Sequence, residues 1–186
     1  MLLKDKKILI MGIRNKWSIA FGIAKSAYEN GAQLIFTYMG EDNKSKIEEL
    51  ISEFKGSKAY VLNGASEDEL VRDTFKKIKE ENGKIDGIVH AIAHANTEDL
   101  HNDFIFTSKE GYLHAIEVSA YSFVLAARIA KELDLLKEKK ILLVHGGGFN
   151  WHQPDHFRVV YLPRIEVLKE AAGKIREFLE TYRQEI

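Results

Sequence analysis

The stretch that most constrains the fold is residues 6–38, which has the pattern of a strand, a polar loop, a helix and a second strand. The apolar run at residues 8–11 ends at Gly12, which is typical of a strand buried on both faces of a parallel sheet. Ser18 then precedes apolar residues at helical spacing, and an Asn-Gly pair at residues 30–31 predicts the end of that helix.

The loop and helix start of this unit form the first candidate functional site. In such a unit, unpaired backbone N–H groups and the positive end of the helix dipole meet at the loop, where a nucleotide pyrophosphate can bind. The glycine spacing alone is weak evidence, because nine residues separate Gly12 from Gly22 and the G-x-G-x-x-G pattern is absent. A tight turn with close helix packing explains the two glycines equally well.

The rest of the chain alternates between strands and helices. Further strands are expected at residues 59–62, 86–93, 140–144 and 157–162, and further helices at 43–54, 66–82, 107–133 and from 163 onward. This order predicts an α/β fold, a Rossmann-like three-layer sandwich with a mostly parallel sheet of about six strands. The loop at residues 146–156 is too short for a helical crossover, which leaves open an antiparallel last strand at the sheet edge.

Composition limits the classes of protein to which the chain can belong. The 186 residues are 45% hydrophobic and 30% charged, which suits a single domain over residues 1–186. Lys+Arg 27 against Asp+Glu 28 gives a net charge of −1, so neither nucleic acid nor an anionic membrane is an expected partner. No apolar run of membrane-spanning length and no signal peptide is recognised, so the expected location is cytoplasmic.

No metal site is predicted from the side chains that could bind a metal ion. The sequence contains no cysteine. His90 and His94 are too far apart along a strand to chelate one ion, and His90 is expected to be a core or strand-end residue. His152, Asp155 and His156 are interpreted as neighbours by chance in a loop.

Several segments together carry a specific resemblance. The loop G-I-R-N-K-W-S-I-A-F-G-I-A-K at residues 12–25, with residues 31–38, 86–93, 103–112 and 119–123, resembles bacterial enoyl-acyl carrier protein reductases. These are divergent short-chain dehydrogenases/reductases, and the resemblance covers about residues 3–132. It implies that Gly12, Ser18 and Ile19 contact the pyrophosphate of NADH. It also implies that Ala91, Ile92 and Ala93 line the ribose and nicotinamide side.

Four positions near the expected adenosine end depart from or qualify the resemblance. An Asp-Val pair that holds the adenine in this family is replaced by Gly64 and Ala65, and losing the carboxylate could weaken binding by about 1–3 kcal/mol. Met39 stands where a polar side chain often meets the ribose. Glu41 would repel a 2′-phosphate, which favours NADH over NADPH.

The catalytic pair of the family is not recognised. These reductases use a tyrosine six residues before a lysine, just after the fifth strand, and no such pair follows residue 140. Tyr161 and Lys169 come closest, but seven residues intervene and Pro163 stands between them. Tyr161 is therefore only a weak catalytic candidate.

The tail carries a second resemblance. Residues 133–186 resemble the C-terminal end of alanine-type aminotransferases, which use pyridoxal phosphate. There, the arginine at the position of Arg158 binds the substrate carboxylate. The Schiff-base lysine and phosphate cradle of those enzymes belong to a domain with no counterpart here, so no pyridoxal phosphate site is expected. Arg158 is interpreted as a surface residue of an edge strand.

The two resemblances lead to one hypothesis and two alternatives. The hypothesis is an engineered or chimeric protein, reductase-like at 1–132 and aminotransferase-like at 133–186, with weak NAD(H) binding at best and catalysis lost. The first alternative is a working reductase of an acyl thioester that uses Tyr161 or Tyr121 as proton donor. The second is a folding scaffold that binds no ligand. The oligomeric state is left open.

Overall fold

The computed structural model describes residues 1–137, 144–145, 157–158, 173, 176–177 and 180. It divides into two compact units, Met1–Lys137 and Glu138–Ile186. Strands of the first unit are β1 (Lys7–Met11), β2 (Gln33–Tyr38), β3 (Lys58–Val61) and β4 (Gly87–His90). Its helices are α1 (Ile19–Glu29), η1 (Glu41–Asn43), α2 (Lys44–Ile51), α3 (Asp68–Asn82), α4 (Thr97–His101), η2 (Phe104–Phe106), α5 (Lys109–Ile116), η3 (Glu117–Tyr121) and α6 (Ser122–Glu132).

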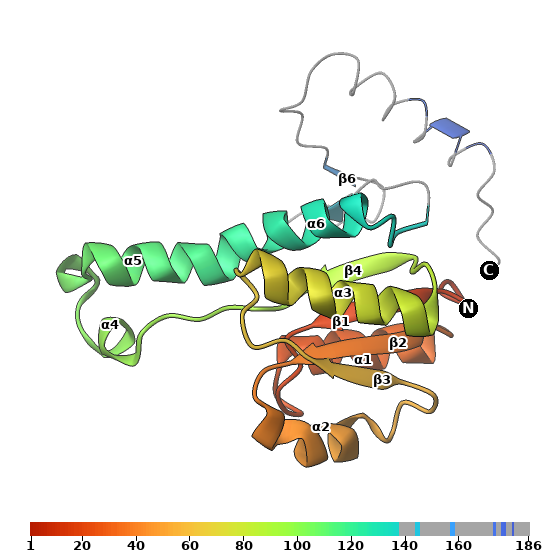
Figure 1. The fold of residues 1–186 in the computed structure, drawn as a ribbon, viewed down its shortest axis with the longest axis horizontal. Helices are drawn as coiled ribbons and strands as arrows, with labels where there is room; N and C mark the ends of the chain where they lie inside the picture. Colours follow the sequence, from red (N-terminus) through yellow and green to blue (C-terminus); the bar gives the residue numbers. More distant parts are fainter. Residues whose placement is uncertain (138–143, 146–156, 159–172, 174–175, 178–179, 181–186) are drawn as a thin grey trace. The chain divides into compact units, whose positions relative to one another are not determined.

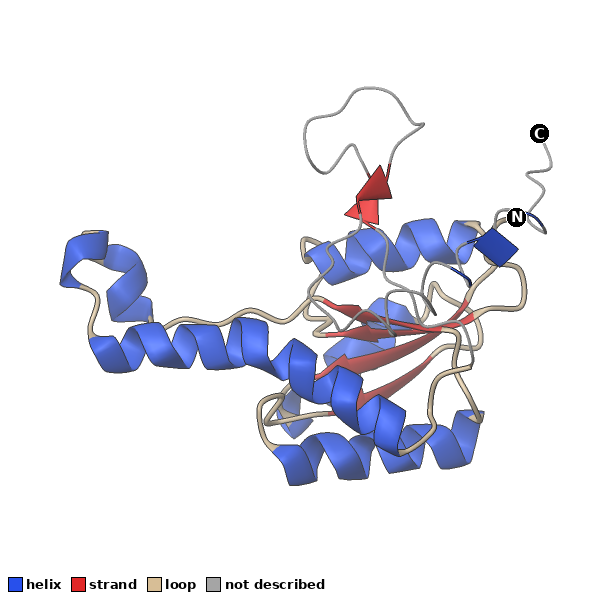
Figure 2. Ribbon diagram, turned by 90° about the horizontal axis from the view of Figure 1, so that it is seen from above, coloured by secondary structure: helices blue, strands red, loops and turns tan. Residues whose placement is uncertain are grey.

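The first unit is a three-layer sandwich (Figures 1 and 2). Side chains alternate across β1, so Leu9 and Met11 pack with α3 and α6 while Ile10 packs with α1 and α2. All three side chains are fully buried, as the continuous apolar run predicts for a strand covered on both faces.

The sheet has the order β3-β2-β1-β4, and its neighbouring strands are parallel. The predicted α/β Rossmann-like fold is confirmed. Among the described residues four strands form this sheet, and a parallel bridge joins Ile85 to Leu136. Residues 138–143, where the next predicted strand begins, lie outside the described residues.

The described part of the second unit contains β5 (Val144–His145) and β6 (Phe157–Arg158). They pair antiparallel in a separate two-stranded sheet, with Val144 opposite Arg158. The antiparallel direction agrees with the prediction from the loop length, and the expected place of this strand at the edge of the main sheet stays a prediction. Most of the predicted closing helix lies outside the described residues; Gly173, Arg176, Glu177 and Glu180 are helical.

Helix starts were predicted with mixed success. Ser18 and Ser108 cap α1 and α5, each accepting a hydrogen bond from the N–H three residues on. Asn43 stands at the N-cap position of α2, the start of the helix predicted over 43–54, but its side chain donates to the Met39 carbonyl at 2.9 Å and does not cap the helix. The helix predicted from residue 66 begins at Asp68, after Glu67, without a side-chain cap.

Helix α5, the π-helical turn η3 and α6 form a continuous helix over Lys109–Glu132. Within the described residues it is the one helix long and apolar enough to cross a membrane by length and composition, which the sequence analysis did not expect. Its two ends differ: Leu125 and Ile129 of α6 are buried in the core, whereas α5 extends past the sheet (Figure 1). Core packing therefore accounts for Leu125 and Ile129, whereas Phe123 and Val124 of the same half are 41% and 59% exposed.

Candidate site at the carboxyl edge of the sheet

The candidate site lies where β1 and β4 end. The chain passes from β1 outward through β2 to β3, then returns to place β4 on the other side of β1, so the strand order reverses between β1 and β4. Open α/β sheets bind ligands at the carboxyl ends of the strands at such a reversal. The register pairs Met11 with both Thr37 and His90, which brings the loops after β1 and β4 to the same edge.

Gly12 is required by the backbone at this edge. Its φ is +88°, and a Cβ there would lie 2.7 Å from the Ala91 carbonyl oxygen and 2.8 Å from Cγ1 of Ile92. The N–H groups of Gly12 and Ile13 both donate to the Thr37 carbonyl at 3.0 Å. Gly12 therefore packs two predicted site segments together through backbone contact, and its own N–H is already bonded.

The residues before α1 form a tight hydrogen-bonded turn. Trp17 N–H donates to Oδ1 of Asn15 at 2.9 Å, and the Ser18 hydroxyl donates to the Asn15 carbonyl at 2.7 Å. The Ser18 hydroxyl also accepts a hydrogen bond from Phe21 N–H at 3.3 Å, so it stabilises the start of the helix.

Two backbone N–H groups remain at this helix start. The first four N–H groups of a helix have no partner inside it. Ser18 accepts hydrogen bonds from the N–H groups of Phe21 and Gly22. Within residues 1–137, no hydrogen bond involves the N–H of Ile19 or Ala20. Ile19 is 78% exposed, and the polar group that it can offer to a ligand at the helix start is its backbone N–H.

The loop at residues 91–93 forms the opposite wall. Ala91 N–H continues the β4 ladder by donating to the Met11 carbonyl at 3.1 Å. Ile92 packs against the core beside α3 and α6, and Ala93 is exposed. The structure thus brings Gly12, Ala91 and Ile92 into contact, while Ser18 and Ile19 lie at the far end of the same loop.

His90 and His94 lie on either side of this loop, and neither was predicted to belong to the candidate site. Nε2 of His90 lies 2.8 Å from Oγ of Ser122, which itself donates to the Val118 carbonyl, so His90 is the donor. Burial lowers the pKa of His90 below its ordinary value, and the ring is neutral at pH 7. His90 is half-buried at the end of β4, as expected for a strand-end residue.

The expected adenosine side contains a carboxylate that sequence reasoning missed. Gly40 N–H donates to Oδ1 of Asn63 at 2.9 Å, which joins the ends of β2 and β3. The carboxylate of Glu67 lies against Gly64, closer than a Cβ there would allow. A carboxylate is therefore present beside the position where the family usually has its aspartate.

The catalytic and metal candidates are placed only in part. Tyr161 and Lys169 lie outside the described residues, as do His152, Asp155 and His156. Tyr121, at the end of the π-helical turn, is 47% exposed. Among the described residues no three His, Cys, Asp or Glu side chains are arranged to hold a metal ion.

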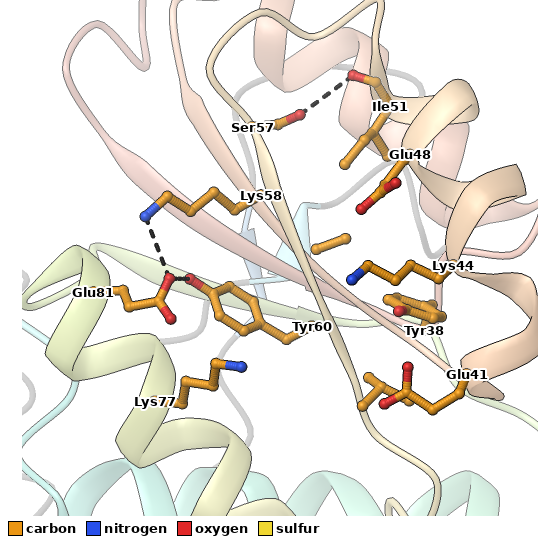
Figure 3. A pocket seen from close by; sticks show the side chains of 12 residues that line it. Tyr38, Glu41, Lys44, Glu48, Ile51, Ser57, Lys58, Tyr60, Lys77 and Glu81 are labelled. Carbon is orange, nitrogen blue, oxygen red and sulfur yellow. Dashed lines mark hydrogen bonds and ion pairs between the residues drawn. The ribbon is translucent and has the colours of Figure 1, made fainter.

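A separate hollow of about 380 Å³ lies along the outer edge of β3 (Figure 3). Its walls combine carboxylates and ammonium groups: Glu81 accepts from Tyr60 at 2.9 Å and pairs with Lys58 at 3.4 Å. Burial raises the pKa of Tyr38 in its wall, and the charges of Glu41 and Glu48 add to the rise. The hollow lies beside β3, whereas the strand order reverses between β1 and β4, and Glu41, which follows β2, is one of the lining residues of the hollow.

A Rossmann-like sheet with a glycine-closed loop at its reversal point defines the class of dinucleotide-binding α/β proteins. The family profile described as enoyl-(acyl carrier protein) reductase matches residues 12–145. The chain belongs to this family.

Individual relatives agree. The chain is 40% identical over 148 residues to the enoyl-acyl-carrier-protein reductase (NADH) of Bacillus cereus, covering 79% of this chain and 58% of that protein. It is 42% identical over 132 residues to the NADPH enzyme of Staphylococcus aureus, covering 70% and 52%. The chain thus spans little more than half the length of these relatives.

Solved structures show the same fold. The reductase of Bacillus cereus with NADP⁺ and indole naphthyridinone matches with a TM-score of 0.67 and 41% identity, over 74% of this chain and 53% of that one. The reductase (NADH) of Aquifex aeolicus matches with a TM-score of 0.69 and 36% identity, over 75% and 54%.

Proposed function

We propose that this chain binds NADH at the carboxyl edge of the sheet, with the pyrophosphate at the start of α1. The observation that carries the proposal is the pair of unbonded N–H groups of Ile19 and Ala20 at the strand reversal, where Gly12 joins the loop to Ala91. The nicotinamide side would be lined by Ala91, Ile92 and Ala93.

The position of Glu67 changes the expectation that the chain binds NADH only weakly. Replacement of the family's Asp-Val pair by Gly64 and Ala65 is expected to remove the carboxylate that holds the adenine. The Glu67 carboxylate against Gly64 can accept the same hydrogen bond, so part of that loss is offset. Glu41 lines the hollow beside β3, and a preference for NADH over NADPH stays a prediction.

We also propose that the chain by itself does not catalyse efficient enoyl reduction. This rests on the absence of a Tyr-x6-Lys pair after residue 140 in the sequence. The test is NADH oxidation with crotonyl coenzyme A as acyl thioester. The proposal expects a rate no higher than that of heat-denatured protein, and turnover above that level would contradict it.

A working reductase is the second candidate, favoured by the family match over residues 12–145. In that case Tyr121 or Tyr161 would supply the proton. Tyr121 has the needed access, because it is 47% exposed beside the contact between His90 and Ser122. Tyr121→Phe and Tyr161→Phe should then abolish turnover, and unchanged rates in both variants would remove this candidate.

The recombined origin of the chain stays a proposal. The family match runs to residue 145, beyond the junction expected near 132, so any junction would lie later than the sequence suggested. The aminotransferase resemblance draws on residues that lie mostly outside the described part. A cytoplasmic location and a single domain over residues 1–186 are likewise proposals.

A further inference from the structure

The hollow beside β3 lies between two helical segments, and the outer edge of the sheet forms its floor. β3 pairs with β2, and within the described residues its other edge has no partner strand. Residues of η1 and α2 line one side of the hollow, and residues of α3 line the other (Figure 3). The hollow is therefore a groove with an unpaired strand edge along its floor.

The unpaired edge offers backbone groups in the pattern of a strand ladder. Leu62 N–H donates to the Tyr38 carbonyl at 2.8 Å. Because bonding alternates along a strand, Ala59 and Val61 turn their N–H and C=O groups away from β2. The Val61 carbonyl accepts a hydrogen bond from the Thr74 hydroxyl at 3.3 Å, which agrees with this direction. The two outward N–H groups and the Ala59 carbonyl have no hydrogen bond within the described residues, so the edge still offers two donors and one acceptor.

Tyr38 adds a hydroxyl group without a partner. Tyr38 is 5% exposed and lines the hollow, and its hydroxyl has no hydrogen bond with a described residue. No fully enclosed side-chain polar atom of a described residue lacks a partner, so the Tyr38 hydroxyl reaches the hollow. Buried polar groups are almost always hydrogen-bonded, so this hydroxyl marks a position where a ligand can form a bond.

The two sides of the hollow carry opposite net charge. The side formed by η1 and α2 has two carboxylates and one ammonium group, a net charge of −1, from Glu41, Glu48 and Lys44. The side formed by α3 and the first residue of β3 has two ammonium groups and one carboxylate, a net charge of +1, from Lys58, Lys77 and Glu81. Among the described lining residues, Lys58 and Glu81 form the one ion pair, and Figure 3 shows Nζ of Lys44 and of Lys77 on opposite sides of β3.

We propose that this groove binds an extended peptide segment of a partner protein, which adds to the free edge of β3 as a further strand. Side chains of a strand point alternately to the two faces of the sheet. An acidic residue of the peptide therefore faces the ammonium group of Lys77, and the basic residue next to it faces the α2 side and the Tyr38 hydroxyl. In this mode of recognition the backbone bonds give affinity, and the contacts of alternate side chains give specificity.

The charge pattern is tested with two peptides of the same composition, each labelled with fluorescein and amidated at its C-terminus. In V-E-K-E-K-V an extended strand carries acidic residues on one face and basic residues on the other, whereas in V-E-E-K-K-V each face carries both. Fluorescence anisotropy with the whole chain should give a dissociation constant about threefold to tenfold lower for the alternating peptide. Equal constants, or no saturable signal with V-E-K-E-K-V, would overturn the proposal.

Strand addition is tested by amide hydrogen exchange, followed by NMR on the whole chain. A saturating concentration of V-E-K-E-K-V should raise the protection of the Ala59 and Val61 amides about fivefold or more, because each N–H gains an acceptor. The Tyr60 amide is the internal control, since it faces β2 and should not change. Binding that leaves the Ala59 and Val61 amides unchanged would show that the peptide does not add to β3.

The place of the peptide is tested with Lys77→Glu. The dissociation constant of V-E-K-E-K-V should rise about fivefold, because an acidic residue of the peptide then meets a carboxylate. Lys76→Glu is the matched control: Lys76 is exposed, pairs with Asp73 at 3.4 Å and does not line the hollow, so this variant should bind as the wild type does. Equal constants for the two variants would overturn the assignment to this groove.

Tyr38→Phe removes the hydroxyl and keeps the ring. We expect the dissociation constant of V-E-K-E-K-V to rise about twofold to tenfold, the equivalent of one hydrogen bond. Far-UV circular dichroism checks that each variant is folded. An unchanged constant in folded Tyr38→Phe would overturn the contact assigned to the hydroxyl. NADH does not enter these measurements, so their outcome is independent of the proposed cofactor site between β1 and β4.

Discussion

The two walls of the crevice between β1 and β4 are built by different means. The β1–α1 wall is assembled by local contacts: Asn15, Ser18 and Phe21 bond to one another within seven residues of chain. The β4 wall is held by partners distant in sequence, such as Ser122, 32 residues after His90. The first wall is therefore encoded in a short motif, whereas the second depends on where the long helix packs.

The largest expected effect is at Gly12, where the two walls touch. Gly12→Val must hold a β-branched residue at φ +88° against the Ala91 carbonyl, which should destabilise the protein by about 3 kcal/mol in urea unfolding. Gly22→Ala is the matched control in α1, because no atom lies within 4 Å of its Cβ; it should stabilise by up to about 1 kcal/mol. Equal stability of the two variants would show that the walls do not meet through Gly12.

A substitution at Asp86 tests the pairing of β1 with β4 at the end of the strands opposite the crevice. Its carboxylate accepts from Lys7 N–H at 2.9 Å and pairs with Lys137 at 2.8 Å. Asp86→Asn should lower the free energy of unfolding by about 2 kcal/mol at pH 7 and leave NADH affinity unchanged. A clear loss of affinity would contradict the assignment of the site to the carboxyl edge.

The contribution of Asp86 to the free energy of unfolding depends on pH with a definite sign. Burial alone would raise the pKa of Asp86, but the hydrogen bonds from Lys137 and Lys7 lower it below its ordinary value. A lowered pKa in the folded state stabilises the protein above the unfolded pKa, and this contribution is lost as pH falls through the folded value. The difference between wild type and Asp86→Asn should therefore shrink from pH 7 to pH 3; a constant difference would contradict it.

Ser122→Ala tests the wall held by distant contacts. Ser122 is fully buried, and its removal leaves Nε2 of half-buried His90 without its acceptor. We expect a loss of about 1–2 kcal/mol, measured by urea unfolding, together with weaker NADH binding. An unchanged NADH dissociation constant would show that the β4 wall does not contact the cofactor.

The smallest expected effect comes from the helix caps. Ser18→Ala and Ser108→Ala should each lower stability by about 1 kcal/mol, because each serine caps one helix. Only Ser18→Ala should also weaken NADH binding, since α1 begins at the crevice. If both variants, or neither, change the NADH dissociation constant, the helix start of α1 is not the pyrophosphate site.

Sequence reasoning succeeded where the signal was local. The buried run ending at Gly12, the cap at Ser18 and the strand at Gln33–Tyr38 follow from composition and spacing within one segment. Asn43 precedes α2 without capping it, because a 3-10 turn leads into the helix and the Asn43 side chain bonds back to the Met39 carbonyl.

The missed features of the site depend on packing between segments. The Glu67 carboxylate against Gly64 results from how the chain enters α3, which begins at Asp68 and not at residue 66 as predicted. The bond between His94 and His114 needs α5 to run beside the 91–94 loop, and no periodicity predicts that. Side chains that approach across tens of residues leave no spacing pattern in the sequence.

NADH fluorescence titration tests the central claim most directly. The account predicts a saturable signal that NAD⁺ displaces, retained in Gly22→Ala and weakened in Ser18→Ala. A signal that rises linearly with NADH and equals that of heat-denatured protein would contradict it, and would leave a Rossmann-like chain that binds no ligand at this edge.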